Sequence, residues 1–314
     1  ANCSVATGAN VPNNLGALSL NAGYTGTVTF QKNATATAMT LSVTKDIRVN
    51  AGNLVFEGDT AGGGGNGLGY TLSAANIIVA AGASLHANAK GFALGTGPGA
   101  GGTQAGGGYG GSGANSTGLG GLPYGSATAP TALGSGGGTS NGQGPGGLGG
   151  GALKLNVTGT ATLNGTVSVN GLDSTGWEGA GAGGSLWVVA GTLAGTGTLS
   201  ANGGAGFPGY GSGAGGGGRI DLAQVTNYAF AGSIQALGGT GGNRRGFTGT
   251  LVFPTGYFNT FAPAKDITLG HGQTFGDVTI NNGVTLTLDP TSAAEQTFTF
   301  TSLTIKNGGT VMAL

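Results

Sequence analysis

Short stretches of alternating apolar and polar residues recur along the chain, and each is followed after two spacer residues by a glycine. Five copies of this pattern are Leu18–Gly23, Ile47–Gly52, Ile77–Gly82, Val278–Gly283 and Leu303–Gly308. Strict alternation predicts a strand with one buried face. Because glycine adopts positive φ without steric cost, we predict that each strand ends at a turn. The predicted turn glycines are Gly23, Gly52, Gly82, Gly283 and Gly308.

A longer repeat occupies the centre of the chain. Its copies open at Leu153, Leu186, Ile220 and Leu251, which we expect to lie in register on adjacent strands. Each copy holds two strand-like segments and then a glycine-rich excursion. A single unit cannot bury its own apolar face, and periods of 20–50 residues are typical of stacked repeats. The pattern therefore predicts an all-β fold, a parallel β-solenoid or β-helix.

The glycine-rich excursions leave from equivalent points of the repeat, so we expect them to emerge on one side of the molecule. The longest spans about Gly91–Gly150 and contains 26 glycines but no Asp, Glu, Lys or Arg. Disordered segments usually stay soluble through charge, which this tract lacks. Two interpretations are open, free loops or packed segments. We favour packing, in the form of polyglycine or polyproline II-like helices, because glycine allows close backbone approach.

The changes in composition divide the chain into three regions of what we expect to be one continuous domain. N-terminal strands occupy 1–60, the glycine-rich repeats 61–257, and C-terminal strands 258–314. No window shows the 3.6-residue apolar period of an amphipathic helix. No apolar run reaches 18 residues, so we predict no membrane span.

The chain is very poor in charge. Of its 314 residues 75 are glycine and only 6% are charged, with ten basic and ten acidic side chains, whereas roughly 25% are charged in ordinary globular proteins. Attraction to nucleic acid needs clustered Lys and Arg, so we predict no nucleic-acid partner. A neutral surface also gives little protection against self-association.

Catalytic and metal-binding motifs are missing from the sequence. Glycosidases need paired carboxylates, but the acidic residues are scattered, and the segment Gly270-His271-Gly272 resembles a polygalacturonase motif without its acidic partners. His86 has no metal-ligand spacing to another candidate ligand and is expected to point outward from a strand. We predict no enzyme activity, no catalytic residue, no metal and no cofactor.

Aromatic residues interrupt the glycine-rich tracts and are the candidate contact residues. They are Tyr109, Tyr124, Trp177, Phe207 and Tyr210. Exposed aromatic rings stack on sugars or anchor a partner, whereas buried ones would hold the glycine segments together; the second interpretation is favoured. The adjacent Arg244 and Arg245 are expected to form a solvated tip.

The first residue is Ala and the single cysteine is Cys3. A removed secretory signal would explain a start without Met, so we expect the protein to act outside the cell or at its surface. Cys3 has no intrachain partner, which leaves either an idle thiol or an intermolecular bridge.

Three sequence segments resemble those of known proteins: Ser185-Leu-Trp-Val-Val-Ala190, Leu199-Ser-Ala-Asn-Gly-Gly204 and Gly213-Ala-Gly-Gly-Gly-Gly-Arg-Ile220. Together with the repeats over roughly 70–255, they resemble the glycine-rich repetitive β-solenoid proteins of microbial cell surfaces, which include adhesins and fibre-forming proteins. The glycine tracts are also similar to the glycine-rich layers of some phage tail-fibre adhesins. The resemblance implies an extracellular structural role and assigns no ligand or site.

Three functions of different kinds follow as hypotheses. The first is a structural subunit that assembles head to tail with copies of itself into an extracellular filament through strand addition. The second is an adhesin or glycan-binding module that uses aromatics on its glycine-rich face, with binding to ice as a variant of this idea. The third and most remote is a polysaccharide-degrading β-helix enzyme.

Overall fold

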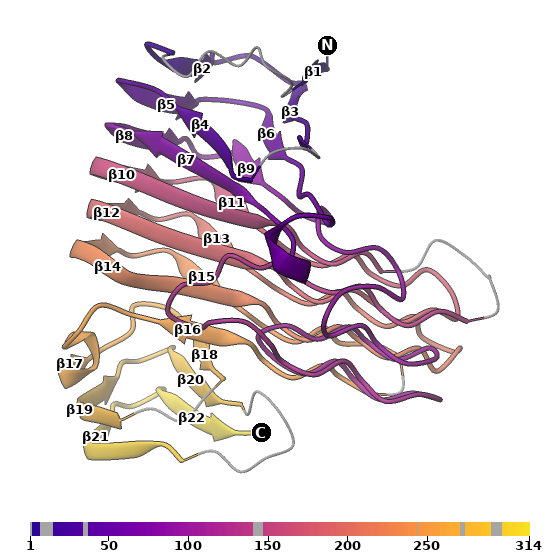
Figure 1. Cartoon of the computed structure of the whole chain (residues 1–314). Helices are drawn as coiled ribbons and strands as arrows, with labels where there is room; N and C mark the ends of the chain where they lie inside the picture. The colour runs from indigo at the N-terminus through magenta and orange to yellow at the C-terminus, as the bar shows by residue number, and fades with distance from the viewer. Residues whose placement is uncertain are drawn as a thin grey trace.

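The computed structural model describes residues 2–6, 15–33, 37–140, 147–242, 244–270, 274–289 and 297–314. Its strands pair in parallel within four sheets (Figure 1). The helices in these described residues are two short 3₁₀ turns, η1 (Gly63–Gly65) and η2 (Tyr257–Asn259). None of the described helices has the length and apolarity needed to cross a membrane.

Two large sheets form what we call the strand stack. The first has seven strands in the order β1 (Cys3–Val5), β3 (Thr27–Phe30), β6 (Asn53–Phe56), β9 (Ser84–His86), β11 (Thr166–Ser168), β13 (Thr198–Ser200) and β15 (Ser233–Gln235). The second has nine strands, with the order β16 (Thr250–Val252), β14 (Arg219–Phe230), β12 (Ser185–Gly195), β10 (Ala152–Leu163), β8 (Asn76–Val79), β5 (Asp46–Val49) and β2 (Leu18–Leu20). Its other members are β7 (Tyr70–Ala74), which pairs with β10, and β4 (Met39–Ser42), which pairs with β7.

The register predicted for the central repeat is confirmed. Leu153 lies opposite Leu186, Leu186 opposite Ile220, and Ile220 opposite Leu251. All four side chains are buried in the main hydrophobic core between the sheets. Since side chains alternate across a strand, this register places the apolar residues at every second position of each strand inside the stack.

Turn residues connect strands at the edges of the large sheets and of the small C-terminal sheets. Gly23, Gly52, Gly82, Gly283 and Gly308 have φ between 70° and 86°, the conformation that these turns require. Asparagine side chains join one layer to the next: the Asn88 Oδ1 accepts from the Asn170 N–H, and the Asn170 Oδ1 accepts from the Asn202 N–H, each at 2.7 Å.

Two small parallel sheets follow the strand stack toward the C-terminus. One contains β17 (Thr260–Phe261), β19 (Thr274–Ile280) and β21 (Thr299–Ile305); the other contains β18 (Ile267–Leu269), β20 (Thr285–Leu288) and β22 (Thr310–Ala313). Aromatic rings fill the junction. Phe253 stacks on Tyr257 at 4.4 Å between ring centroids, and Phe275 stacks on Phe300 at 4.9 Å.

The prediction of one parallel β-solenoid through the chain is wrong. The strands form four separate parallel sheets, and none of them forms a solenoid. The backbone ladder stops after β16, where the chain passes through Pro254, η2 and Pro263, and proline has no N–H to donate to a neighbouring strand. The stacked polyglycine or polyproline II-like helices predicted with the solenoid have no counterpart among the described elements, which are strands and short 3₁₀ turns.

The glycine-rich excursions project together from one side of the strand stack (Figure 1). We call their packed part the glycine-rich layer; its segments are 105–114, 132–140, 147–151, 179–184, 213–218 and 246–249. Almost all of these residues are buried, and backbone hydrogen bonds join the segments. For example, the Gly107 N–H donates to the Ala180 carbonyl at 2.9 Å, and the Gly107 carbonyl accepts from Gly216 at 2.8 Å.

Glycine is required in this layer because neighbouring backbones lie where a side chain would start. A Cβ added to Gly106 would overlap the carbonyl oxygen of Ala214, and one added to Gly138 would overlap that of Gly102. The glycine-rich layer is therefore held together by hydrogen bonds between peptide groups. Its segments can come close enough to form these bonds because glycine has no side chain to separate them.

Candidate binding site on the glycine-rich layer

The five aromatic residues singled out in the glycine tracts fall into two groups. Tyr109 is fully buried and packs against Tyr124 at 4.9 Å between ring centroids. Trp177, Phe207 and Tyr210 instead lie together at the surface. The structure therefore shows the burial that one interpretation requires for Tyr109, and the exposure that the other requires for Trp177 and Tyr210.

The buried pair holds the glycine-rich layer to the strand stack. The Tyr109 hydroxyl bonds to the Ser185 Oγ at 2.6 Å, and Ser185, at the start of β12, donates to the Ala132 carbonyl at 2.6 Å. The Tyr124 hydroxyl donates to the Leu133 carbonyl. Burial raises the pKa of both phenols, so they remain protonated and serve as structural hydrogen-bonding groups.

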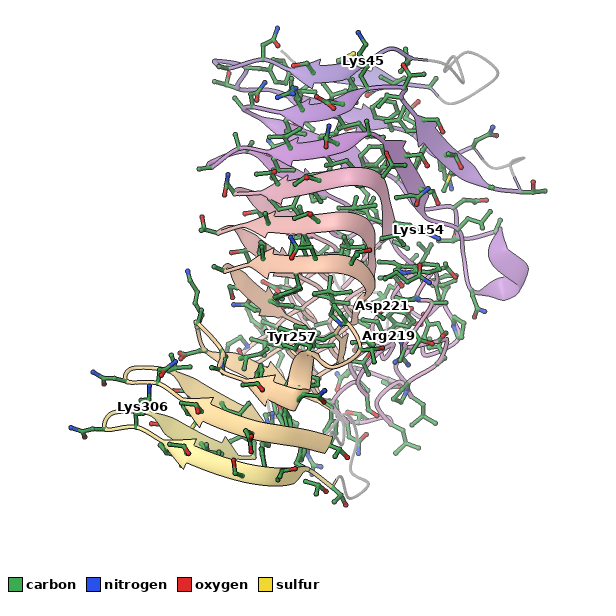
Figure 2. All side chains as sticks on the ribbon, turned by 90° about the vertical axis from the view of Figure 1, so that its left-hand side faces the viewer. Lys45, Lys154, Arg219, Asp221, Tyr257 and Lys306 are labelled. Atoms are coloured by element: carbon green, nitrogen blue, oxygen red, sulfur yellow. The ribbon has the colours of Figure 1, made fainter. Side chains whose placement is uncertain are left out.

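Arg219 completes this anchor from the first position of β14, where the strand stack meets the glycine-rich segments (Figure 2). Its guanidinium lies 5.2 Å from the Tyr109 ring centroid and donates to the carbonyls of Tyr109 and Tyr124 at 3.2 and 2.7 Å. It also donates to the Thr250 Oγ1 at 3.1 Å. The cation is 6% exposed, and carbonyl oxygens and an aromatic face offset its desolvation.

The surface group is a continuous aromatic cluster. Tyr210 lies between the other two rings, with its centroid 4.7 Å from that of Trp177 and 5.2 Å from that of Phe207. The planes of Phe207 and Tyr210 differ by only 14°. Trp177 and Tyr210 are 43% and 44% exposed. Rings held against one another offer a rigid apolar platform to a ligand at little cost in side-chain entropy.

A polar cavity of about 350 Å³ adjoins this cluster. Its lining residues are Gln104, Asn115, Ser116, Thr117, Tyr210, Gly211 and Arg244. The volume falls at the lower end of the roughly 300–1,000 Å³ range of small-ligand sites. Tyr210 thus belongs to both the aromatic cluster and the cavity wall, so a single ligand could contact an aromatic face and several polar groups.

Hydrogen bonds fix the polar side chains of the cavity. The Gln104 Oε1 accepts from the Thr117 hydroxyl at 2.6 Å, while its Nε2 donates to Ser140 at 3.2 Å. The Asn115 Oδ1 accepts from the Gly120 N–H at 2.7 Å. Gln104 also has φ of 59°, an unusual conformation for a residue other than glycine, and such outliers cluster at binding sites. The cavity is therefore preorganised.

The two adjacent arginines are both exposed, as the predicted solvated tip requires, but they have different neighbours. Arg245 donates from both terminal nitrogens to the buried Asp289 carboxylate, at 2.7 Å each, and this pairing raises its pKa. Arg244 instead lines the polar cavity.

The described residues contain no group of three or more His, Cys, Asp or Glu that could hold a metal ion. His86 is partly buried in β9, and its burial and then the charge of Lys90 lower its pKa. His271, in the segment that resembles a polygalacturonase motif, lies outside the described residues. Whether the protein has enzymatic activity stays a prediction from the sequence.

The single cysteine is exposed on β1 and unbridged. Its exposure would let Cys3 form a disulfide with a second molecule, as the intermolecular bridge requires.

Comparisons with family models, with curated proteins and with solved structures each found no significant match.

Sequence reasoning identified Tyr210 but missed the polar residues of the cavity wall. Gln104, Asn115 and Thr117 come from the uncharged tract and look like ordinary loop residues in the sequence. The one available signal was Arg244, a charged side chain in a region that has almost none. What the sequence could not indicate is that 104–117, 210–211 and 244 meet.

Proposed function

We propose that the protein is a carbohydrate-binding module that acts outside the cell or at its surface, with the aromatic cluster and the adjoining cavity as its binding site. The observation that carries this proposal is the exposed, stacked group of Trp177, Phe207 and Tyr210 beside a preorganised polar cavity. Sugar rings have apolar C–H faces that pack on aromatic rings, and hydroxyls that exchange hydrogen bonds with amides and hydroxyls.

The charge-poor surface supports the same proposal. A chain with only 6% charged residues lacks the clustered Lys and Arg that nucleic acid requires, whereas binding to sugars depends on stacking and short-range hydrogen bonds. The strand stack and the glycine-rich layer would then serve as a rigid support, since sites on well-packed elements keep their geometry better than sites on free loops.

A glycan array, followed by titration calorimetry on the best ligand, tests this proposal. Trp177→Ala and Tyr210→Ala are each expected to weaken binding at least tenfold while leaving the thermal unfolding temperature close to that of the unchanged protein. Leu303→Ala, an exposed apolar residue on β21, is the matched control and should bind normally. Undiminished binding by both aromatic variants, or no binding to any glycan, would contradict the proposal.

A second candidate function, the head-to-tail filament subunit, is supported by a different surface. The edge strands β21 and β22 expose Leu303, Ile305 and Met312 at 41%, 49% and 43%. Unpaired parallel edges with apolar side chains are templates for strand addition. In this proposal a second copy adds its own strands to that edge.

Sedimentation velocity over a wide concentration range and electron microscopy test the filament. Leu303→Lys on the exposed edge should then dissolve assemblies that the unchanged protein forms, because it places a charge at the contact. A monomer at all concentrations would contradict this second function and leave the first unaffected.

A further inference from the structure

The polar cavity has an unusual electrostatic character for this protein. Among the described residues that line it, Arg244 is the one charged side chain and none is a carboxylate. The described residues offer Arg244 no ion-pair partner, whereas its neighbour Arg245 is neutralised by Asp289. In a chain with ten basic side chains, an unpaired guanidinium at a cavity therefore sets the local potential.

The remaining polar side chains of the cavity also favour a ligand that accepts hydrogen bonds. The amide oxygens of Gln104 and Asn115 are both engaged, by Thr117 and by the Gly120 N–H. The Asn115 amide nitrogen has no partner in the described part of the chain and can donate to a ligand. The cavity thus offers a guanidinium and an amide N–H₂ as free donors, while each of its side-chain amide oxygens already accepts one hydrogen bond.

Carboxylates near the aromatic cluster do not cancel the positive charge at the cavity. Glu178, next to Trp177 in the sequence, is 1% exposed and does not line the cavity. Asp173 accepts a hydrogen bond from the Ala205 N–H at 2.7 Å. Neither carboxylate reaches Arg244 within ion-pair distance, as the ion pairs of the described residues show.

We propose that this site binds acidic sugars, with the anionic group of the sugar on Arg244 and Asn115 and its ring face on the exposed aromatic cluster, which Tyr210 joins to the cavity wall. This inference rests on the carbohydrate-binding function proposed above. A guanidinium presents its donors in a planar fork that matches the two oxygens of a carboxylate, and such charge-assisted pairs are roughly twice as strong as neutral ones. A carboxylate of a uronic acid and a sulfate ester share this chemistry.

Titration calorimetry with matched oligosaccharides tests the inference. The probes are an oligogalacturonate, the same oligosaccharide after carboxyl reduction, and a sulfated neutral oligosaccharide. The unchanged protein is expected to bind the carboxylated probe at least tenfold more tightly than the reduced one, with the difference shrinking as salt is raised. The sulfated arm shows whether the site prefers a planar carboxylate or any anion.

Variants separate a specific contact from general attraction. Arg244→Gln should abolish the preference for the acidic probe, so that the acidic and the reduced probe bind with equal affinity, while Arg244→Lys should retain part of the preference. Lys306→Gln removes one exposed charge at the C-terminal sheets (Figure 2), from a residue that does not line the cavity, and should change nothing.

The possible failures are distinguishable. Equal binding of acidic and reduced probes by the unchanged protein, or an intact preference in Arg244→Gln, overturns the assignment of acidic sugars but leaves the carbohydrate-binding function standing. Absence of binding to all probes and to a glycan array overturns both.

Discussion

The strand stack and the glycine-rich layer are both well buried, but different parts of the chain fill them. In the stack, Leu153, Leu186 and Ile220 lie opposite one another on successive strands, and their side chains form the core. In the layer, Gly107 contributes only its peptide groups, which pair with Ala180 and Gly216. The comparison shows that one chain can exclude water with side chains in one place and with bare backbone in another, so the two regions should respond oppositely to a change in residue size.

The largest effect is expected from removing a core side chain in the stack. Leu186 is fully buried, and Leu186→Ala should lower the free energy of unfolding by about 2–5 kcal/mol because it leaves a cavity. Urea denaturation measures this loss. Leu119→Ala, at a position 78% exposed on the glycine-rich side, is the control and should change stability by less than about 0.5 kcal/mol.

In the layer it is the addition of a single carbon that should destabilise the protein. Gly106→Ala places a Cβ against the Ala214 carbonyl and should cost about 1–3 kcal/mol, as overpacking does. Gly16→Ala is the matched control, since a Cβ there meets nothing within 4 Å. If Gly106→Ala unfolded at the same urea concentration as the control, the close backbone packing of the layer would be refuted.

The contact between the strand stack and the glycine-rich layer should contribute less to the stability of the protein than the interior of either region. Tyr109→Phe removes the hydroxyl that bonds to Ser185 in β12 at 2.6 Å. A buried hydrogen bond between neutral groups contributes about 1 kcal/mol, so we expect a loss of that size. Tyr210→Phe, at an exposed ring, should leave the unfolding temperature unchanged, and an equal loss in both variants would contradict the anchoring role.

The smallest effect on stability is expected from substituting Asp221 in β14, and this substitution should stabilise the protein rather than destabilise it. Its side chain is fully buried, its Oδ2 has no hydrogen-bond partner in the described residues, and burial raises its pKa above 3.8 (Figure 2). The folded protein therefore binds this proton more tightly than the unfolded chain, so stability falls as the pH rises from near 3.8 through the raised pKa.

Asp221→Asn keeps the shape of the side chain and removes this titration. It should raise the unfolding temperature at pH 8 and change it little at pH 3. Differential scanning calorimetry at both values checks the sign, and a variant that is less stable at pH 8 would show that the ionised carboxylate has a partner.

Much of the local structure could be predicted from the sequence, because it depends on neighbouring residues. The alternation in Leu18–Gly23 and its four relatives indicates strands and turns, and the spacing of Leu153, Leu186, Ile220 and Leu251 predicts their register. The prediction of a single solenoid was wrong because repetition alone does not reveal where the ladder of backbone hydrogen bonds stops. That point depends on how Pro254, η2 and the aromatic junction pack.

The candidate site was harder to predict, as two tyrosines illustrate. Tyr109 and Tyr210 both stand between glycines, in Gly108-Tyr109-Gly110 and Gly209-Tyr210-Gly211. Tyr109 is fully buried, whereas Tyr210 is 44% exposed. Their local sequences are alike, so the distinction arises only from which segments pack against each ring.

The sequence by itself determined which residues form strands, where they turn and which of them face inward, since these properties follow from a period of two and from the conformational freedom of glycine. The sequence favoured packed glycine tracts over free loops, but the tertiary structure alone decided which segments pair, and that Gln104, Asn115, Tyr210 and Arg244 share one cavity. The physical reason is that hydrogen bonds between peptide groups are available to every residue alike. Their partners are therefore chosen by the arrangement of whole segments, which no short stretch of sequence encodes.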